Sequence, residues 1–194
     1  MKMYNKKKSV FQEKESRMAS KKDTQLYDLI PSQNAMYYMF MFSLHKNVMQ
    51  IPTSIKADKP LDIAALKKAF AIEVQRNDCL RLRFKLTTDG VKQRFLPSVP
   101  VKEIPVMNFA SEEEEEACLN ADAQKSVRFL RGETFRFIIF NDCRGNTGLY
   151  FNVSHIIMDA LGIGIFYADL FAVYDAVLNG RELPPPMARY EDAV

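Results

Sequence analysis

The side chain best suited to chemistry in this sequence is the imidazole of His155. It follows an apolar run, residues 149–153, that is typical of a buried β-strand. Histidine titrates near neutral pH and can take a proton from an incoming nucleophile. On spacing alone a structural role is the commoner one for a lone histidine at a strand end, so the surrounding residues must decide.

Small residues follow the histidine, at Ala160, Gly162 and Gly164, and then an apolar segment, residues 165–178, predicts a helix. The order strand, polar turn, helix places His155 at the carboxyl end of a strand, where α/β architectures build their sites. Asp159 lies four residues after the histidine. We expect its carboxylate to fix the turn by pairing with a base elsewhere, because it is too far along the chain to reach the same proton.

Two arginines form a second group of candidates at a predicted helix–strand junction. Asp62 predicts the N-cap of a helix that ends near residue 76. From residue 80 onward apolar and basic residues alternate, which is typical of a strand, and Asp89-Gly90 predicts a hairpin turn. Arg76 and Arg81 flank this junction, and on alternation alone they would belong to a solvated strand face.

Both stretches resemble motifs of one family. Residues 154–160, Ser-His-Ile-Ile-Met-Asp-Ala, resemble the His-His-x-x-x-Asp-Gly motif of the chloramphenicol acetyltransferase-like superfamily, which includes the condensation domains of nonribosomal peptide synthetases. Residues 76–84 resemble the Arg-His-Glu-x-Leu-Arg-Thr-x-Phe motif of condensation domains. Ser154 stands in place of the first histidine and Ala160 in place of the glycine. In the second motif Asn77, Asp78 and Leu82 replace His, Glu and Thr.

The resemblance covers residues 25–194 and implies an α+β fold, a chloramphenicol acetyltransferase-like αβ sandwich with a mixed sheet flanked by helices. This part corresponds to the N-terminal half of a condensation domain, in which the active site lies in a tunnel between two such halves. We therefore expect residues 24–194 to form this N-terminal subdomain and residues 1–23 to form a basic disordered tail. The chain is then a fragment, half of a split enzyme, or a self-assembling enzyme like the trimeric chloramphenicol acetyltransferase.

The chemistry that the resemblance implies is acyl transfer from a phosphopantetheine thioester to an amine or hydroxyl. The thioester is carried by an acyl or peptidyl carrier protein or by coenzyme A, and no covalently bound cofactor is implied. His155 is expected to act as general base or to position the nucleophile. The expected supporting residues are Asp159, paired with Arg76 or Arg81, together with Ser154, Ala160 and Gly162. The methyl group of Ala160 would strain the backbone if that position needs a positive φ.

Two other functions are kept open. A non-catalytic or degenerate condensation-like module would dock carrier proteins or partner subunits, and His155 would then tolerate mutation. A metal site ranks third, because His155 and Asp159 supply only two ligands and His45 has no motif that links it to them.

Charge and cysteine usage restrict the remaining classes. Residues 1–22 carry a net charge of +6, so the remainder carries −3, and this basic stretch has neither interleaved aromatic residues nor a sustained apolar face. We expect no nucleic-acid and no membrane partner, since no signal peptide and no apolar run near the length of a membrane span is evident. Three widely spaced cysteines favour a reducing cytoplasm over a disulfide framework or a zinc site.

The other predicted elements are structural. Pro31-Ser32 opens a helix with Ser32 as the expected cap, and Ala35, Met36, Met39 and Phe40 are expected to face the core. Residues 50–56 predict a strand, and Pro52 indicates that it lies at a sheet edge or contains a bulge. Ser111 followed by five glutamates predicts a capped helix start, where carboxylates oppose the helix dipole and need no metal to explain them.

Overall fold

The computed structural model describes residues 25–194, so the predicted tail, residues 1–23, lies outside the described part of the chain. Its helices and strands alternate in an α+β order, as expected. In chain order they are β1 (Tyr27–Asp28), α2 (Pro31–Phe42), β2 (Gln50–Lys56), α3 (Ile63–Arg76), β3 (Leu82–Thr87), β4 (Gly90–Phe95), β5 (Val106–Asn108), α4 (Glu112–Ala123), β6 (Phe135–Asn141), β7 (Thr147–Ser154) and α5 (Ala160–Asn179).

A four-stranded mixed sheet lies at the centre of the fold, in the order β2-β7-β6-β5. Its pairs are antiparallel except β5 with β6, which is parallel. All eight residues of β7 are buried, which explains the continuous apolar run in the sequence. β2 lies at the sheet edge, the position that Pro52 predicts.

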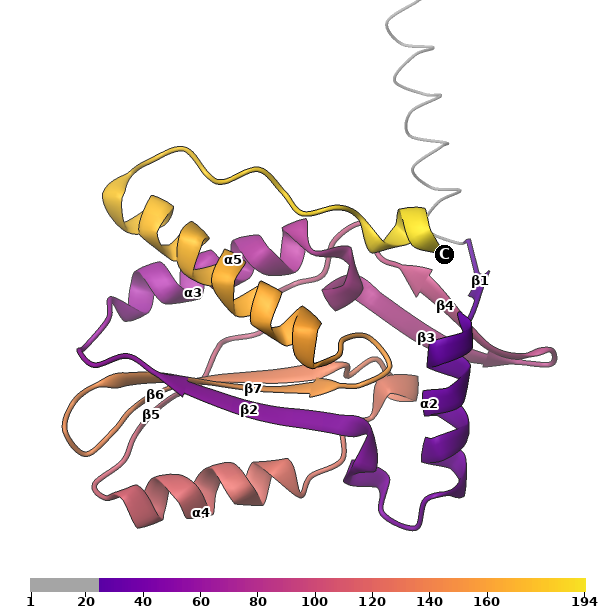
Figure 1. Ribbon diagram of the computed structural model, residues 1–194, viewed down its shortest axis with the longest axis horizontal. Helices are drawn as coiled ribbons and strands as arrows, with labels where there is room; N and C mark the ends of the chain where they lie inside the picture. Colours follow the sequence, from indigo (N-terminus) through magenta and orange to yellow (C-terminus); the bar gives the residue numbers. More distant parts are fainter. Residues whose placement is uncertain (1–24) are drawn as a thin grey trace, which may run out of the picture.

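Helices cover both faces of this sheet (Figure 1): α3 and α5 lie on one face and α4 on the other. The side chain of Asp62 accepts a hydrogen bond from the Ala65 amide at 2.8 Å, so the predicted cap of α3 is confirmed. Stacked rings join α3 and α5 to the sheet, with Phe70 against Phe137 at 4.0 Å and Phe151 against Phe166 at 4.6 Å between ring centroids. This aromatic core fixes the sheet end from which His155 projects.

A second sheet contains three antiparallel strands in the order β1-β4-β3. The predicted hairpin between β3 and β4 forms, but its two loop residues are Thr88 and Asp89, one position earlier than predicted. Gly90 is the first residue of β4 and has a φ of 105°, a region that L-residues rarely adopt. The resemblance implied only the mixed sheet, so this separate small sheet is an addition. It lies beside α2 and the C-terminal residues (Figure 1).

Helix α5 begins earlier than the sequence predicts. Its first residue is Ala160 rather than Ile165, because the Asp159 side chain caps it. With 20 residues and a mean hydropathy of 1.6, it is long and apolar enough to cross a membrane, so the expectation that no segment approaches such a length is wrong. Phe166, Leu170 and Val173 are buried in the protein core, which is the ordinary position for an apolar helix of a folded domain.

Two expectations for α2 are also wrong. Its N-cap residue is Ile30 rather than Ser32, and the Gln33 side chain accepts a hydrogen bond from the Ile30 amide at 3.1 Å. Only part of the Met and aromatic stripe is covered: Met36 and Phe40 pack against the core, whereas Met39 is 45% exposed. A serine cap is not needed because the side chain of Gln33, in the first turn of the helix, reaches back to the backbone amide of Ile30. At α4 the predicted cap is confirmed, since Ser111 accepts from the Glu114 amide at 3.2 Å.

Candidate active site

His155 is the first residue after β7, and the sheet holds its backbone in place. Its amide donates to the carbonyl of Met49 at 2.8 Å, which ties the turn to the residue that precedes β2. The side chain is half-buried. Within residues 25–194 neither ring nitrogen has a hydrogen-bond partner, so the imidazole is available to a ligand.

His155 lines a pocket of about 550 Å³. Its walls come from four places: the start of α2, the turn between β7 and α5, the residues after α3, and the C-terminal segment 187–193. The lining is mainly aliphatic and sulfur-containing, with Met36, Ile157 and Met187 among its members. A concave, mainly apolar site with a few polar side chains, His155 among them, has the composition expected of a binding site for an acyl compound.

Asp159 lies in the same pocket but has a structural contact. Its Oδ1 accepts a hydrogen bond from the Gly162 amide at 2.8 Å and so caps α5. A Cβ on Gly162 would come within 2.9 Å of the Met158 Cγ and 3.4 Å of that carboxylate oxygen, so the tight cap requires glycine here. Asp159 therefore holds the turn, as expected, but through the helix terminus.

The expected pairing of Asp159 with Arg76 or Arg81 is wrong. Arg76 Nη2 donates to the Pro185 carbonyl at 2.9 Å and lies 3.7 Å from the carboxylate of Asp169. Arg81 Nε donates to the Leu96 carbonyl at 2.8 Å. The physical reason is the helix rise: Asp169 is ten residues along α5, about 15 Å from its start. The end of α3 therefore meets the middle of α5 and not its N-terminus.

The two departures from the histidine motif lie away from the pocket or at its helix start. Ser154 is fully buried in β7, and the alternation of a strand directs its side chain to the face opposite His155. Its hydroxyl has no hydrogen-bond partner in the described part of the chain. Ala160 is the exposed first residue of α5, and no non-glycine residue between 25 and 194 has a positive φ. The predicted strain at Ala160 is therefore absent.

Asp78 is a residue of this site that the sequence analysis did not select. Its carboxylate is buried and accepts hydrogen bonds from the amides of Tyr190 at 3.0 Å and Glu191 at 2.9 Å. These bonds anchor segment 187–193, which forms one wall of the pocket. A partial signal was present in the sequence, because Asp78 lies in the motif around Arg76, but nothing indicated that its carboxylate contacts residues near 190.

Gln33 was likewise missed as a site residue. It is buried at the start of α2 and donates to the Gln93 side chain at 2.8 Å and to the Ile156 carbonyl at 3.2 Å. It therefore connects the turn after His155 to the small sheet. A buried glutamine with three partners fixes the geometry of the pocket floor.

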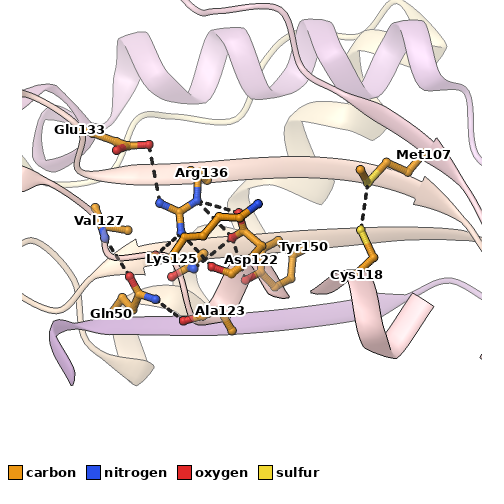
Figure 2. Close-up of polar contacts among 11 residues, drawn as sticks. Gln50, Met107, Cys118, Asp122, Ala123, Lys125, Val127, Glu133, Arg136 and Tyr150 are labelled. Atoms are coloured by element: carbon orange, nitrogen blue, oxygen red, sulfur yellow. Dashed lines mark hydrogen bonds and ion pairs between the residues drawn. The ribbon is translucent and has the colours of Figure 1, made fainter. Parts of the chain in front are cut away.

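The opposite face of the sheet carries a different polar cluster, centred on Asp122 at the end of α4 (Figure 2). The carboxylate accepts hydrogen bonds from Arg136 Nε at 2.9 and 3.1 Å, from the Tyr150 hydroxyl at 3.0 Å and from Asn152 Nδ2 at 3.1 Å. Burial and the Asp122 charge raise the pKa of Tyr150. Every carboxylate oxygen is occupied, so this cluster holds α4 to the sheet.

No metal centre is evident in the described part of the chain. No group of three or more His, Cys, Asp or Glu residues there is placed to hold an ion. His155 and Asp159 share the pocket, but His45 is not among its lining residues.

Comparison with known proteins shows the class of this fold. It resembles the starter condensation domain of rhizomide synthetase, with a TM-score of 0.80 at 20% identity over 88% of this chain and 42% of that one. A mutant of that domain in complex with C8-CoA and Leu-SNAC gives a TM-score of 0.81 at 20% identity over 91% of this chain and 41% of that one. These are solved chloramphenicol acetyltransferase-like folds, so the predicted fold class is confirmed.

The Condensation domain family model matches residues 23–194, and the chain belongs to this family. Among curated proteins it is 26% identical to gramicidin S synthase 2 of Brevibacillus brevis over 168 residues, which is 81% of this chain and 4% of that protein. It is 24% identical to surfactin synthase subunit 1 of Bacillus subtilis over 174 residues, 90% of this chain and 5% of that protein. The chain thus spans a small fraction of its curated relatives and less than half of the solved domains.

Proposed function

We propose that this chain is the histidine-bearing half of a condensation-type acyltransferase. It would transfer an acyl group from a phosphopantetheine thioester, on a carrier protein or coenzyme A, to an amine or hydroxyl. The observation that carries the proposal is the unpartnered imidazole of His155 in an apolar pocket of a condensation fold. The complex of the rhizomide synthetase domain with C8-CoA and Leu-SNAC supports the choice of an acyl thioester donor and an amine acceptor.

The role proposed for His155 is to accept or direct the proton of the nucleophile. As the acceptor nitrogen or oxygen attacks the thioester carbonyl, its proton passes to the imidazole. The C–S bond then breaks, the proton goes to the departing thiolate, and an amide or ester remains. General-base help of this kind contributes roughly 10²–10⁴ in rate, and holding the two substrates together contributes more.

The second wall of the site is proposed to come from another polypeptide segment. The chain covers 41–42% of the solved rhizomide synthetase domain, and its His155 pocket is open to solvent on one side. Either a C-terminal condensation half or further copies of this chain would close it. We infer that substrates reach His155 only in that assembled state.

The test is acyl transfer measured with the partner half supplied. The native mass of the chain is measured first by light scattering, to distinguish a self-assembled oligomer from a monomer. Product formation from C8-CoA and Leu-SNAC is then followed for wild type, His155→Ala and His45→Ala. The matched control removes the other histidine, which is exposed and outside the pocket.

The expected result is a loss of about 10²–10⁴ in turnover for His155→Ala alone. Equal turnover in all three proteins would reject a catalytic role for His155. A folded assembly that binds carrier protein but forms no product would instead support the non-catalytic docking module.

A cytoplasmic location stays a prediction. It rests on the three cysteines, Cys79, Cys118 and Cys143, all of which are free thiols in the structure.

A further inference from the structure

A second cavity, of about 390 Å³, lies along the outer edge of β6 and shares no residue with the His155 pocket. Segment 99–105 covers it, and Phe70 and Val74 of α3 form part of its apolar floor. Its volume falls within the roughly 300–1,000 Å³ of ligand pockets. The acyl-transfer proposal makes no use of it.

The edge of β6 that faces this cavity has unpaired backbone groups. The Ser154 amide donates to the Thr134 carbonyl at 2.8 Å, so alternate residues Phe135 and Phe137 direct their N–H and C=O groups away from β7. β5 pairs only with Ile139–Asn141. The neighbouring residue, Pro105, has no N–H to donate to Phe137. Among residues 25–194 no partner occupies these outward groups, which leaves the place of one short strand empty.

One end of the empty strand position is marked by a cation that has no ion-pair partner among residues 25–194. The Arg83 side chain lies against Gly132, just before β6, and lines the cavity. Its Nη1 donates to the Leu82 carbonyl at 2.6 Å, but the described chain offers it no carboxylate partner. Arg94 is directly opposite on β4, a like-charge pairing that destabilises a sheet. Burial and Arg94 lower the pKa of the Arg83 guanidinium.

None of the other charged residues that line the cavity forms an ion pair with Arg83 in the described part of the chain. Asp122 and Glu133 both pair with Arg136, at 2.9 and 3.6 Å. Lys102 and Glu103 carry opposite charges, so these five residues carry a formal net charge of −1, but no carboxylate among them is paired with Arg83. Thr134 lines the same cavity, is 2% exposed, and its hydroxyl has no hydrogen-bond partner in the described part of the chain. A bound anion that contacts Arg83 would supply the missing ion-pair partner at this end of the empty strand position.

We propose that the cavity binds the C-terminus of a peptide in extended conformation. The peptide adds a strand to the edge of β6 at Phe135 and Phe137, antiparallel to it. Its last apolar side chain enters the cavity, and its α-carboxylate contacts Arg83. Strand addition supplies affinity through main-chain hydrogen bonds, and the pocket and the cation supply the selection for a free apolar C-terminus.

The experiment measures binding of a fluorescent tetrapeptide that ends in valine with a free carboxylate, by fluorescence anisotropy. The same peptide with a C-terminal amide, and one with methylated backbone nitrogens, test the carboxylate and the strand pairing separately. Arg83→Gln is compared with Lys85→Gln, a matched control on the same strand whose side chain is exposed and outside the cavity. Protection of the Phe135 and Phe137 amides from hydrogen exchange reports the pairing directly.

We expect the amide peptide and the Arg83→Gln variant each to weaken binding by roughly 10-fold or more, because a charge-assisted contact is lost. Lys85→Gln should change it by less than about 2-fold, as expected for an exposed charge. Arg83→Lys keeps the positive charge but loses the planar guanidinium, which can form two parallel hydrogen bonds to a carboxylate. Its affinity for the peptide should therefore lie between those of wild type and Arg83→Gln. His155→Ala should bind the peptide normally, so this result does not depend on the acyl-transfer proposal.

Three outcomes would overturn the inference: no binding at millimolar peptide, equal binding of the amide and free-acid peptides, or equal binding by Arg83→Gln and Lys85→Gln. Should Arg83→Gln lose its native circular dichroism, the amide peptide and Arg83→Lys still decide the question with folded protein.

Discussion

Strand β7 positions two polar sites that differ in how completely their polar groups are hydrogen-bonded. In the middle of the strand, Tyr150 and Asn152 both donate to Asp122, whose carboxylate also receives Arg136. Just after the carboxyl end, the half-buried imidazole of His155 has no partner among the described residues. One strand therefore positions a carboxylate whose oxygens are both occupied and, a few residues later, a side chain without a hydrogen-bond partner. The Asp122 cluster is not complete, because Asn152 Oδ1 is buried without a partner in the described part of the chain.

The two polar sites differ in role: the Asp122 cluster connects elements of the fold, whereas the His155 imidazole is left accessible. Buried polar groups with all their partners hold elements together, and removing one member leaves the others stranded. An imidazole without a hydrogen-bond partner at the rim of an apolar pocket contributes little to stability and is accessible to a ligand. The Asp122 cluster and the His155 pocket should accordingly respond in opposite ways to mutation.

The largest expected effect is on stability at the Asp122 cluster. Asp122→Ala should lower the free energy of unfolding by about 3–5 kcal/mol, because it removes the closer of the two carboxylates that pair with Arg136 and leaves the Tyr150 and Asn152 donors without their acceptor. Urea denaturation measures this. Glu112→Ala, which removes an exposed ion pair with Arg144, should cost less than about 1 kcal/mol. His155→Ala should cost less than about 0.5 kcal/mol. A larger loss from His155→Ala than from Asp122→Ala would reverse the comparison.

The next prediction tests whether the buried Asp78 carboxylate holds one wall of the His155 pocket in place. Asp78→Ala removes the acceptor for the Tyr190 and Glu191 amides and should cost about 1–3 kcal/mol. Hydrogen exchange of those two amides should accelerate, while that of the β7 amides stays slow. Asp58→Ala, at an exposed position, is the control. Unchanged exchange at Tyr190 would show that other contacts hold the pocket wall.

Local features of this fold were readable from the sequence. These features depend on turn chemistry and periodicity within a few residues: the presence of a hairpin near Asp89, the caps at Asp62 and Ser111, and the strands around residues 50–56 and 149–153. The histidine motif also located the pocket, because it marks a strand-to-helix turn that the fold keeps. For these features the short-range preference and the tertiary structure agree.

Contacts between residues far apart in the chain could not be predicted from the sequence. Asp78 and Tyr190 are 112 residues apart, and Asp122 reaches Asn152 across 30 residues. No local pattern distinguishes these acids from others on helix surfaces. The pairing assigned to Asp159 failed for a related reason: the sequence shows that a carboxylate and an arginine exist, but the packing of α3 against the middle of α5 decides whether they meet.

Glu73 is a buried acid whose carboxylate oxygens have no hydrogen-bond donor close by in the described part of the chain. Glu73 on α3 is fully buried, with Arg76 3.9 Å away. Burial and the neighbouring Asp169 raise the pKa of Glu73 from 4.5 to about 8, against the opposing effect of Arg76. The folded state then holds a proton that the unfolded state releases, so stability should fall as pH rises from 4.5 to about 8.

Glu73→Gln, which mimics the protonated acid, should flatten this pH dependence. The variant should be more stable than wild type near pH 8 by about 1.4 kcal/mol or more, the equivalent of one pKa unit. Unfolding free energies at several pH values measure it, and Glu116→Gln on the exposed face of α4 is the control. A stability that rises between these pH values in wild type would mean that Arg76 holds the Glu73 carboxylate ionised.

The smallest effect concerns Asp159, the acid of the pocket itself. Its oxygen accepts one amide hydrogen bond, against the four that Asp122 accepts, so Asp159→Ala should cost only about 1 kcal/mol, as expected for a lost helix cap. Asp159→Asn keeps a capping oxygen and removes the charge, and it should cost a few tenths of a kcal/mol. In a double-mutant cycle with Arg76→Ala the coupling energy should stay within about 0.5 kcal/mol, because the two side chains do not meet. Two results would contradict this: an Asp159→Asn variant as destabilised as Asp159→Ala, and a coupling energy with Arg76→Ala above about 0.5 kcal/mol. They would mean that the Asp159 charge interacts with an arginine, so that this carboxylate belongs to an ionic network, as Asp122 does on the other face of the sheet.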